Sequence, residues 1–228
     1  MIQRIFFDLD DTLLDFQKAE AAALTRALGQ ARIACTPAVL ARYHVLNQEQ
    51  WQLLERGLLS REQVLLRRFD LLFAELGAER SSEAVCRCYE GFLAEGHVFL
   101  PGAEALLRRL APRYELYLAS NGASAVQRSR LKSADLEQYF RGIFISEELG
   151  ADKPQKAFFD ACFAAIPDFS RETALMVGDS LTSDIRGGHN AGIRTCWFNA
   201  QYLPAREDIT PEYTIFALEE LVPLLERL

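Results

Sequence analysis

Cysteines, long hydrophobic runs and excess basic charge are each scarce or missing in this sequence, and each of them marks a particular class of protein. Its 228 residues include only five cysteines, an odd and scattered number that fits a reducing cytoplasm better than a disulfide framework. No hydrophobic run approaches the length of a membrane span, and no charged-then-apolar leader precedes the first apolar stretch. The net charge is −7, so the basic excess of a general nucleic-acid binder is missing. We therefore expect a cytoplasmic protein with neither polymeric nucleic acid nor a membrane as a partner.

What the chain does contain is a long alternation of apolar strands and helices. Half of the residues are hydrophobic and a quarter are charged, as in a soluble globular protein. An apolar strand lies at the N-terminus and ends at Asp8, and the alternation begins near residue 100. Further strands are predicted at 114–119, 142–145, 174–177, 194–198 and 214–215, with helices at 103–110, 124–134, 155–165, 184–191 and from 218. This order predicts a parallel sheet that is covered on both sides through right-handed crossovers.

The stretch between the first strand and this alternation is helical throughout. Helices are predicted at 19–28, 43–54, 60–76 and 82–93, and Pro37 suits a helix start. Ser60 followed by Gln63 forms a capping box, and Gly77 is placed to end that helix. We therefore predict an α/β fold with a Rossmann-like, doubly wound parallel sheet core from residues 1–15 and 97–228. Residues 16–96 form an inserted all-helical cap domain in this prediction.

Acidic residues end the first strand abruptly. Asp8 and Asp10 stand at the carboxyl end of a strand, where open α/β sheets bind their ligands. Two carboxylates this close repel each other unless a cation or a shared proton relieves them. The segment predicts a metal site, a nucleophile or both, with a solvated turn as the alternative.

Two further strand ends could hold an anion. Ser120, Asn121 and Gly122 precede a helix, whose free N–H groups point toward a bound anion; an ordinary helix cap is the alternative. Lys153 precedes Pro154, which would begin the next helix and keep the lysine out of helical geometry. That lysine either reaches a phosphate or is a plain surface residue.

A fourth strand end adds more carboxylates. Gly178 permits close backbone approach, Asp179 follows the strand, and Asp184 would open a helix, where it could also be only a cap. Oxygen ligands without histidine or cysteine indicate Mg²⁺ rather than zinc. All four polar clusters should lie on one rim, because the carboxyl ends of parallel strands face the same way.

These four clusters, in this order, resemble the haloacid dehalogenase superfamily of phosphohydrolases, and the resemblance extends over the whole chain. It implies that Asp8 attacks phosphorus and that Mg²⁺ binds Asp8, the backbone carbonyl of Asp10 and Asp179. It also implies that Asp10 is the general acid and base. The phosphate oxygens would be held by Ser120, Asn121 and Lys153, and Asp184 would orient a metal-bound water or Lys153.

A narrower resemblance is to the bacterial house-cleaning pyrimidine 5′-nucleotidases. It is carried by residues 144–154, 176–180, 187–192 and 195–199, and by 47–51 in the helical insertion. The resemblance implies small phosphorylated substrates such as UMP, dUMP and dTMP, and a monomer or small homo-oligomer. The alternatives are a small sugar-phosphate phosphatase or a phosphoglucomutase-like transferase, and then a 2-haloacid dehalogenase or a non-catalytic phosphate-binding protein. A dehalogenase is disfavoured because halide leaves without a proton and needs no acid at Asp10.

The insertion should set substrate choice, because lids of this kind exclude water from the reaction. Phe16, Tyr43, His44 and Trp51 are the candidates for stacking on a base or shaping the pocket. For each of them ordinary helix packing is the alternative, because aromatic residues at helical spacing are usually core.

Overall fold

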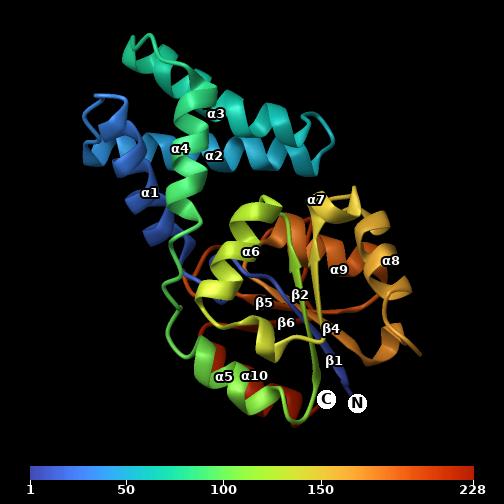
Figure 1. Cartoon of the computed structure of the whole chain (residues 1–228). Coiled ribbons are helices and arrows are strands. Elements are labelled where there is room, and N and C mark those ends of the chain that lie inside the picture. The colour runs from blue at the N-terminus through green and yellow to red at the C-terminus, as the bar shows by residue number, and fades with distance from the viewer. The chain divides into compact units, whose positions relative to one another are not determined.

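The computed structural model describes residues 1–228, which divide into two compact units. The core unit comprises Met1–Phe16 and His97–Leu228, and the helical unit comprises Gln17–Gly96. Figure 1 shows the sheet within the core unit and only helices within the helical unit. The predicted boundary differs at Phe16, which belongs by its contacts to the core unit.

The core unit contains one sheet of six parallel strands, in the order β3-β2-β1-β4-β5-β6. The strands are β1 Arg4–Phe7, β2 Glu115–Ser120, β3 Gly142–Ile145, β4 Ala174–Gly178, β5 Arg194–Phe198 and β6 Tyr213–Ile215. Phe7 lies opposite both Leu118 and Val177 in the register. The carboxyl ends of β1, β2 and β4 therefore lie at nearly the same level. The prediction that their polar residues share one rim needs this alignment.

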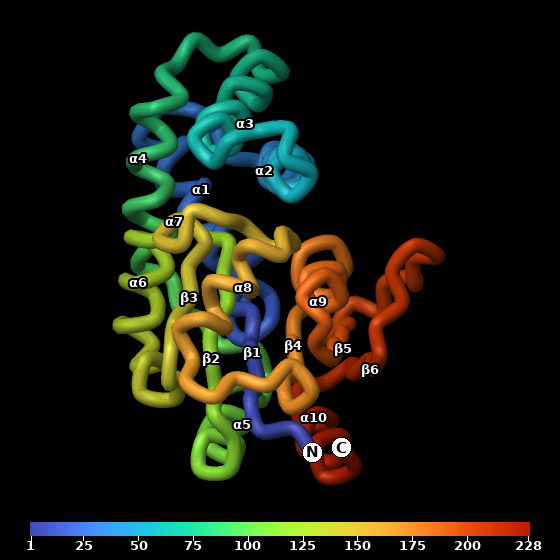
Figure 2. Tube along the Cα trace, turned by 90° about the vertical axis from the view of Figure 1, so that its right-hand side faces the viewer, coloured from blue at the N-terminus to red at the C-terminus, as the bar shows by residue number.

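Helices cover both faces of this sheet, which confirms the doubly wound α/β prediction. Ile5 and Phe7 of β1 belong to a hydrophobic layer that includes α5 Ala103–Leu110, α6 Ser124–Ser133 and α10 Leu221–Leu225. Phe6 points the other way, into a layer with α8 Lys156–Ala164 and α9 Arg186–Ala191. In Figure 2, α8 crosses in front of the strands. A continuous apolar β1 is explained by this two-sided burial.

Four helices build the helical unit, the first of which begins one residue earlier, at Phe16 of the core unit. They are α1 Phe16–Gln30, α2 Pro37–Glu55, α3 Arg61–Leu76 and α4 Ser82–Leu93. The α2 helix starts with Pro37 as its first residue, and α3 has the predicted capping box between Ser60 and Gln63. Gly77 ends α3 in the left-handed conformation, at φ 60°, which glycine adopts without steric cost.

Two predicted helix starts in the core unit are wrong. Pro154 does not begin a helix: it follows a cis peptide bond in a turn, and α8 starts two residues later, at Lys156. Asp184 does not open a helix either. It lies within a single π-helical turn, Leu181–Ile185, which starts earlier because the Ser180 side chain accepts a hydrogen bond from the Ser183 N–H.

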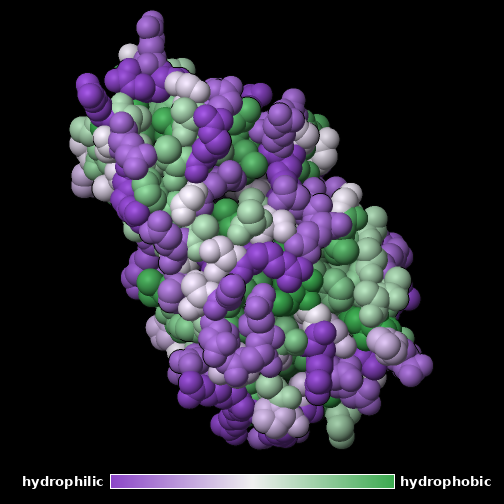
Figure 3. Space-filling model, in the orientation of Figure 1, coloured by the Kyte–Doolittle hydropathy of each residue, from purple (hydrophilic) through white to green (hydrophobic).

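Shorter elements complete the core unit. They are α7 Ser146–Leu149 and the 3₁₀ turns Glu137–Tyr139, Arg171–Thr173 and Leu218–Glu220. None of the helices has both the length and the apolar character needed to cross a membrane. Hydrophilic residues are spread widely over the face seen in Figure 3. All five cysteines are outside disulfides.

Candidate active site at the carboxyl ends of the strands

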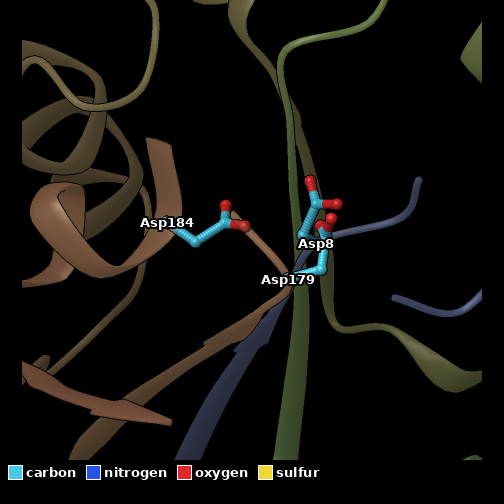
Figure 4. Close-up of side chains that lie close together, drawn as sticks. All are labelled: Asp8, Asp179 and Asp184. Carbon is cyan, nitrogen blue, oxygen red and sulfur yellow. The ribbon is translucent and has the colours of Figure 1, made fainter. Parts of the chain in front are cut away.

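Three carboxylates from two neighbouring strand ends lie together in the core unit (Figure 4). Asp8 follows β1, Asp179 follows β4, and Asp184 reaches back from the π-helical turn. One oxygen of each carboxylate lies within 4.8 Å of the other two. The parallel register brings the first two side chains together, as the sequence predicts.

Lys153 is the cationic member of this cluster. Its Nζ donates to Asp8 Oδ1 at 2.6 Å, to Asp184 Oδ1 at 2.7 Å and to the carbonyl of Ala119 at 2.6 Å. The lysine side chain is almost completely buried, so the alternative of a plain surface lysine is excluded.

Asn121 holds the backbone that carries this lysine. Its side-chain Nδ2 donates to the Lys153 carbonyl and its Oδ1 accepts from the Lys153 N–H, both at 2.9 Å. Asn121 thereby fixes the position of the lysine. Its contact with phosphate oxygens stays a prediction.

Burial and mutual repulsion shift the pKa values of these groups. Burial raises the pKa of Asp8 to about 7, although the Lys153 ammonium opposes the shift. Burial, together with the carboxylates of Asp8 and Asp184, holds the pKa of Asp179 well above its ordinary value. For Lys153, burial acts to lower the pKa, but the carboxylates of Asp184 and Asp8 outweigh it and the pKa is raised.

The donor set fits a divalent cation. When ionised, three carboxylates beside one ammonium leave two negative charges in excess within a few ångströms. A divalent cation would balance them. Only oxygen atoms are offered, which suits Mg²⁺ rather than a metal that prefers nitrogen or sulfur. Asp8 and Asp179 would hold the ion, and the Asp10 carbonyl stays a predicted third ligand. Asp184 contacts Lys153, as predicted, and also belongs to the carboxylate cluster.

The Asp10 carboxylate contacts side chains of α6. Arg130 Nη1 donates to Asp10 Oδ1, and Gln127 Nε2 donates to Asp10 Oδ2 at 2.6 Å. The same Gln127 Nε2 lies 2.8 Å from Ser120 Oγ. A single helix thus connects the predicted general acid to the predicted phosphate-binding hydroxyl.

Sequence reasoning missed several residues that support the site. Gln127 and Arg130 are buried polar residues on α6, and Thr12 is a buried hydroxyl whose Oγ1 accepts from the Asp179 N–H at 3.1 Å. The helical spacing of the sequence could have indicated that Gln127 and Arg130 are buried. Gln127 stands four residues before Leu131, and Arg130 stands four residues after Val126, so each shares a helix face with a buried apolar residue.

The four candidate specificity residues lie in different surroundings. Tyr43 is fully buried inside the helical unit against Phe69 and Tyr89, so it packs there as a core residue. Phe16 lies in the core unit, with its ring centroid 5.9 Å from the Arg130 guanidinium.

The other two candidates join a polar network in the helical unit. His44 Nδ1 lies 2.7 Å from a carboxylate oxygen of the buried Glu20, and Glu20 also accepts from Asn47 at 2.7 Å. Trp51 Nε1 donates to Asn47 Oδ1 at 3.1 Å, and the buried Arg68 donates to the same oxygen at 3.0 Å. His44 and Trp51 both remain partly exposed, so they stay candidates for substrate contact.

Comparison with known proteins gives the family. Residues 2–192 match the model of the haloacid dehalogenase-like hydrolases. The chain belongs to this family. It is an enzyme of the hydrolase class, and the resemblance deduced from its four strand-end clusters is confirmed.

Three relatives are similar over nearly their whole length. The putative HAD-hydrolase YfnB of Bacillus subtilis is 42% identical over 97% of this chain and 94% of its own. Pyrimidine 5′-nucleotidase PynA of Streptococcus pneumoniae is 39% identical, over 98% and 94%. Pyrimidine 5′-nucleotidase YjjG of Escherichia coli is 36% identical, over 97% and 96%. The crystal structure of YfnB bound to magnesium matches with a TM-score of 0.94, covering 98% of both chains.

Proposed function

We propose that this hydrolase is a Mg²⁺-dependent phosphomonoesterase that works through an aspartyl-phosphate on Asp8. The observation that carries the proposal is the Asp8 carboxylate, which lies 2.6 Å from Lys153 Nζ and beside Asp179 and Asp184. A carboxylate nucleophile needs nearby positive charge to meet an anionic phosphate. Lys153 supplies one charge, and a bound Mg²⁺ would supply Lewis-acid charge neutralisation.

In the first step an oxygen of Asp8 forms a bond to phosphorus while the bond to the leaving oxygen breaks. The departing alkoxide takes its proton from Asp10, which follows the nucleophile by two residues. Ser120 and Lys153 stabilise the oxygens of the transferred group as charge spreads over them. The products of this step are the neutral alcohol and the acylphosphate on Asp8.

In the second step water attacks phosphorus in the acylphosphate, and the phosphorus–oxygen bond to Asp8 breaks. Asp10, ionised after the first step, accepts the proton of the attacking water. Inorganic phosphate leaves, Asp8 is regenerated as a carboxylate, and Asp10 is again protonated. The two roles of Asp10 alternate through one cycle, so a single carboxyl group serves both steps.

As substrates we propose pyrimidine nucleoside 5′-monophosphates such as UMP, dUMP and dTMP. Support comes from PynA and YjjG, which are named pyrimidine 5′-nucleotidases and are similar to this chain along its length. The binding of magnesium by YfnB supports the choice of metal. Asp10 favours an ester with an oxygen leaving group over a carbon–halogen bond, since only the former needs a proton donor.

The test is phosphate release from a panel of nucleoside monophosphates and sugar phosphates, with Mg²⁺ and then with EDTA. We expect UMP, dUMP and dTMP to be preferred and all release to stop with EDTA. Preference for glucose 1-phosphate or another sugar phosphate would overturn the substrate and retain the chemistry. No release from any phosphate ester would overturn the phosphatase proposal itself.

Asp8→Asn tests the nucleophile while preserving the shape of the side chain and the fold. We expect this variant to lose all measurable turnover, because the amide is a far weaker nucleophile than the carboxylate. Circular dichroism should show an unchanged helix content. Wild-type turnover in Asp8→Asn would rule out the aspartyl-phosphate.

A further inference from the structure

We propose that Gln127 and Arg130 of α6 are positioning residues that set the Asp10 carboxylate for proton transfer to the leaving oxygen. The inference rests on the proposed function, because it assigns a task to Asp10 only if the leaving group needs a proton. Every residue in the argument belongs to the core unit.

Both oxygens of Asp10 are held by side chains of this one helix. Arg130 Nη1 donates to Oδ1 and Gln127 Nε2 donates to Oδ2, and Arg130 Nη1 also donates to Gln127 Oε1 at 3.0 Å. The three side chains form a closed ring of hydrogen bonds. A carboxylate that is held at both oxygens cannot rotate about its terminal torsion, whereas each oxygen keeps a second lone pair for another partner.

The same amide orients the phosphate-binding hydroxyl. Ser120 Oγ accepts from Gln127 Nε2 at 2.8 Å and from the Gly122 N–H at 3.1 Å. A hydroxyl has two acceptor lone pairs and one donor hydrogen. With both lone pairs occupied, the Ser120 hydroxyl acts toward a substrate as a donor, as an anionic phosphate requires. Gln127 therefore couples the phosphate-binding group to the proton donor.

Two features of the sequence around this network, a glycine at position 122 and a buried arginine at position 130, are explained by the position of Asp10. A Cβ at Gly122 would lie 2.3 Å from Gln127 Nε2, so only glycine lets the amide reach both Ser120 and Asp10. Arg130 is fully buried, and a buried arginine–carboxylate pair often contributes no net stability because desolvation offsets the attraction. The pair is therefore better explained by geometry at Asp10 than by stability.

The dependence on the leaving group distinguishes positioning from a structural role. An alkoxide, as released from UMP, needs the proton of Asp10, whereas p-nitrophenolate is stable enough to leave without one. The ratio kcat/KM reports only the steps up to loss of the leaving group. Misplacing Asp10 should therefore lower kcat/KM for UMP and leave that for p-nitrophenyl phosphate nearly unchanged.

The experiment measures kcat/KM for both substrates in Gln127→Met, Arg130→Met and the full-length wild type with saturating Mg²⁺. For Arg130→Met we expect a loss of about 10- to 100-fold with UMP and at most about threefold with p-nitrophenyl phosphate, the size of effect typical of a misplaced general acid. Gln127→Met should lose activity on both substrates because it also releases the phosphate-binding Ser120 hydroxyl, but the loss should be larger with UMP. Arg128→Met is the matched control. Arg128 lies on the same helix but is paired with Glu148, so both values should stay at the wild-type level.

A second set of variants tests the route through Asp10. In an Asp10→Asn background, Arg130→Met should add no further loss with UMP, because the group that it positions is already inactive. Arg130→Lys keeps a charge without the planar donor pair and should recover part of the UMP activity. If the melting transition shows that Arg130→Met does not fold, Arg130→Lys replaces it in the comparison of the two substrates.

The outcomes separate the two proposals. Equal losses on both substrates, or an additive loss in the Asp10→Asn background, would overturn the positioning role while leaving the phosphatase intact. Full turnover in Asp8→Asn would instead remove the proposed function, whatever the α6 variants do. If UMP is not hydrolysed, the best alkyl phosphate of the panel replaces it.

Discussion

Gly178 shows how a single missing side chain shapes this site. A Cβ there would lie 2.2 Å from Asp184 Oδ2 and 2.7 Å from Asp184 Cβ. Gly178→Ala should push Asp184 away from Lys153, and we expect a loss of about 1–3 kcal/mol in the free energy of unfolding, as for other overpacked buried positions. Phosphate release should also fall sharply. Urea unfolding followed by circular dichroism, with a phosphate-release assay, measures both effects.

Gly91→Ala is the matched control for that substitution. Gly91 lies within α4, and nothing lies within 4 Å of the position where its Cβ would be. Alanine should leave phosphate release unchanged and raise the free energy of unfolding by up to about 1 kcal/mol through helix propensity. Wild-type stability and activity in Gly178→Ala would show that the close approach of Asp184 is not needed.

The sequence predicts the residues at strand ends better than those that support them. Asp8 and Asp179 could be placed together because each directly follows an apolar strand, and parallel strands end on one rim. Gln127 and Arg130 could not be assigned to Asp10, because a polar residue in a helix gives no sign of the group that it meets after folding. The side-chain role of Asn121 was missed for the same reason.

At the scale of elements, the α3 helix offers a test of local sequence control. Ser60 Oγ accepts from the Gln63 N–H at 3.3 Å, and Gln63 Oε1 accepts from the Ser60 N–H at 2.8 Å. Ser60→Ala removes one of these bonds and should cost about 1 kcal/mol in urea unfolding, the usual value for such caps. Ser60→Asp keeps an acceptor and should stay near the wild type. Equal destabilisation by both variants would contradict a capping role.

Helix starts in the core unit were harder to predict than those in the helical unit. In the helical unit, Pro37 and Ser60 set helix starts and Gly77 sets a helix end through residues that are close in sequence. These helix limits can therefore be predicted from the sequence directly. Pro154 stands next to Lys153, whose backbone is bound by the distant Asn121, and that contact keeps the segment in a turn. The π-helical turn before α9 likewise reflects contacts of Asp184 with Lys153 and the Ser180 N–H.

For the whole molecule, the insertion leaves and rejoins the core unit at one place. Leu14 pairs with Phe99, and the Leu100 N–H donates to the Leu13 carbonyl at 3.0 Å. The Asp15 N–H likewise donates to the Val98 carbonyl at 2.8 Å. The two connecting segments thus satisfy each other's backbone groups. A composition change near residues 15 and 97 reveals such an insertion in the sequence, whereas the pairing of its ends does not follow from it.

The stabilisation of the whole protein by Mg²⁺ should increase as the pH rises. The pKa of Asp8 in the metal-free protein is raised to about 7, above the value near 4 of an unfolded chain. Between these values the folded state binds more protons than the unfolded state, so this group lowers stability as the pH rises. Mg²⁺ requires the ionised carboxylate and should offset that loss, with an affinity about tenfold higher at pH 8 than at pH 6.

The measurement is the melting temperature with and without Mg²⁺ at pH 6 and at pH 8, with calorimetric titration for the affinity. We expect a larger upward shift at pH 8, because a ligand that binds only the folded state stabilises it according to its affinity. Asp8→Asn is the comparison, since an amide does not titrate in this range. Its shift should depend less on pH than that of the wild type, with Asp179, whose pKa is also raised, as the titrating carboxylate that remains. Equal shifts in the wild type would mean that Asp8 is already ionised at pH 6, with the Lys153 ammonium outweighing its burial.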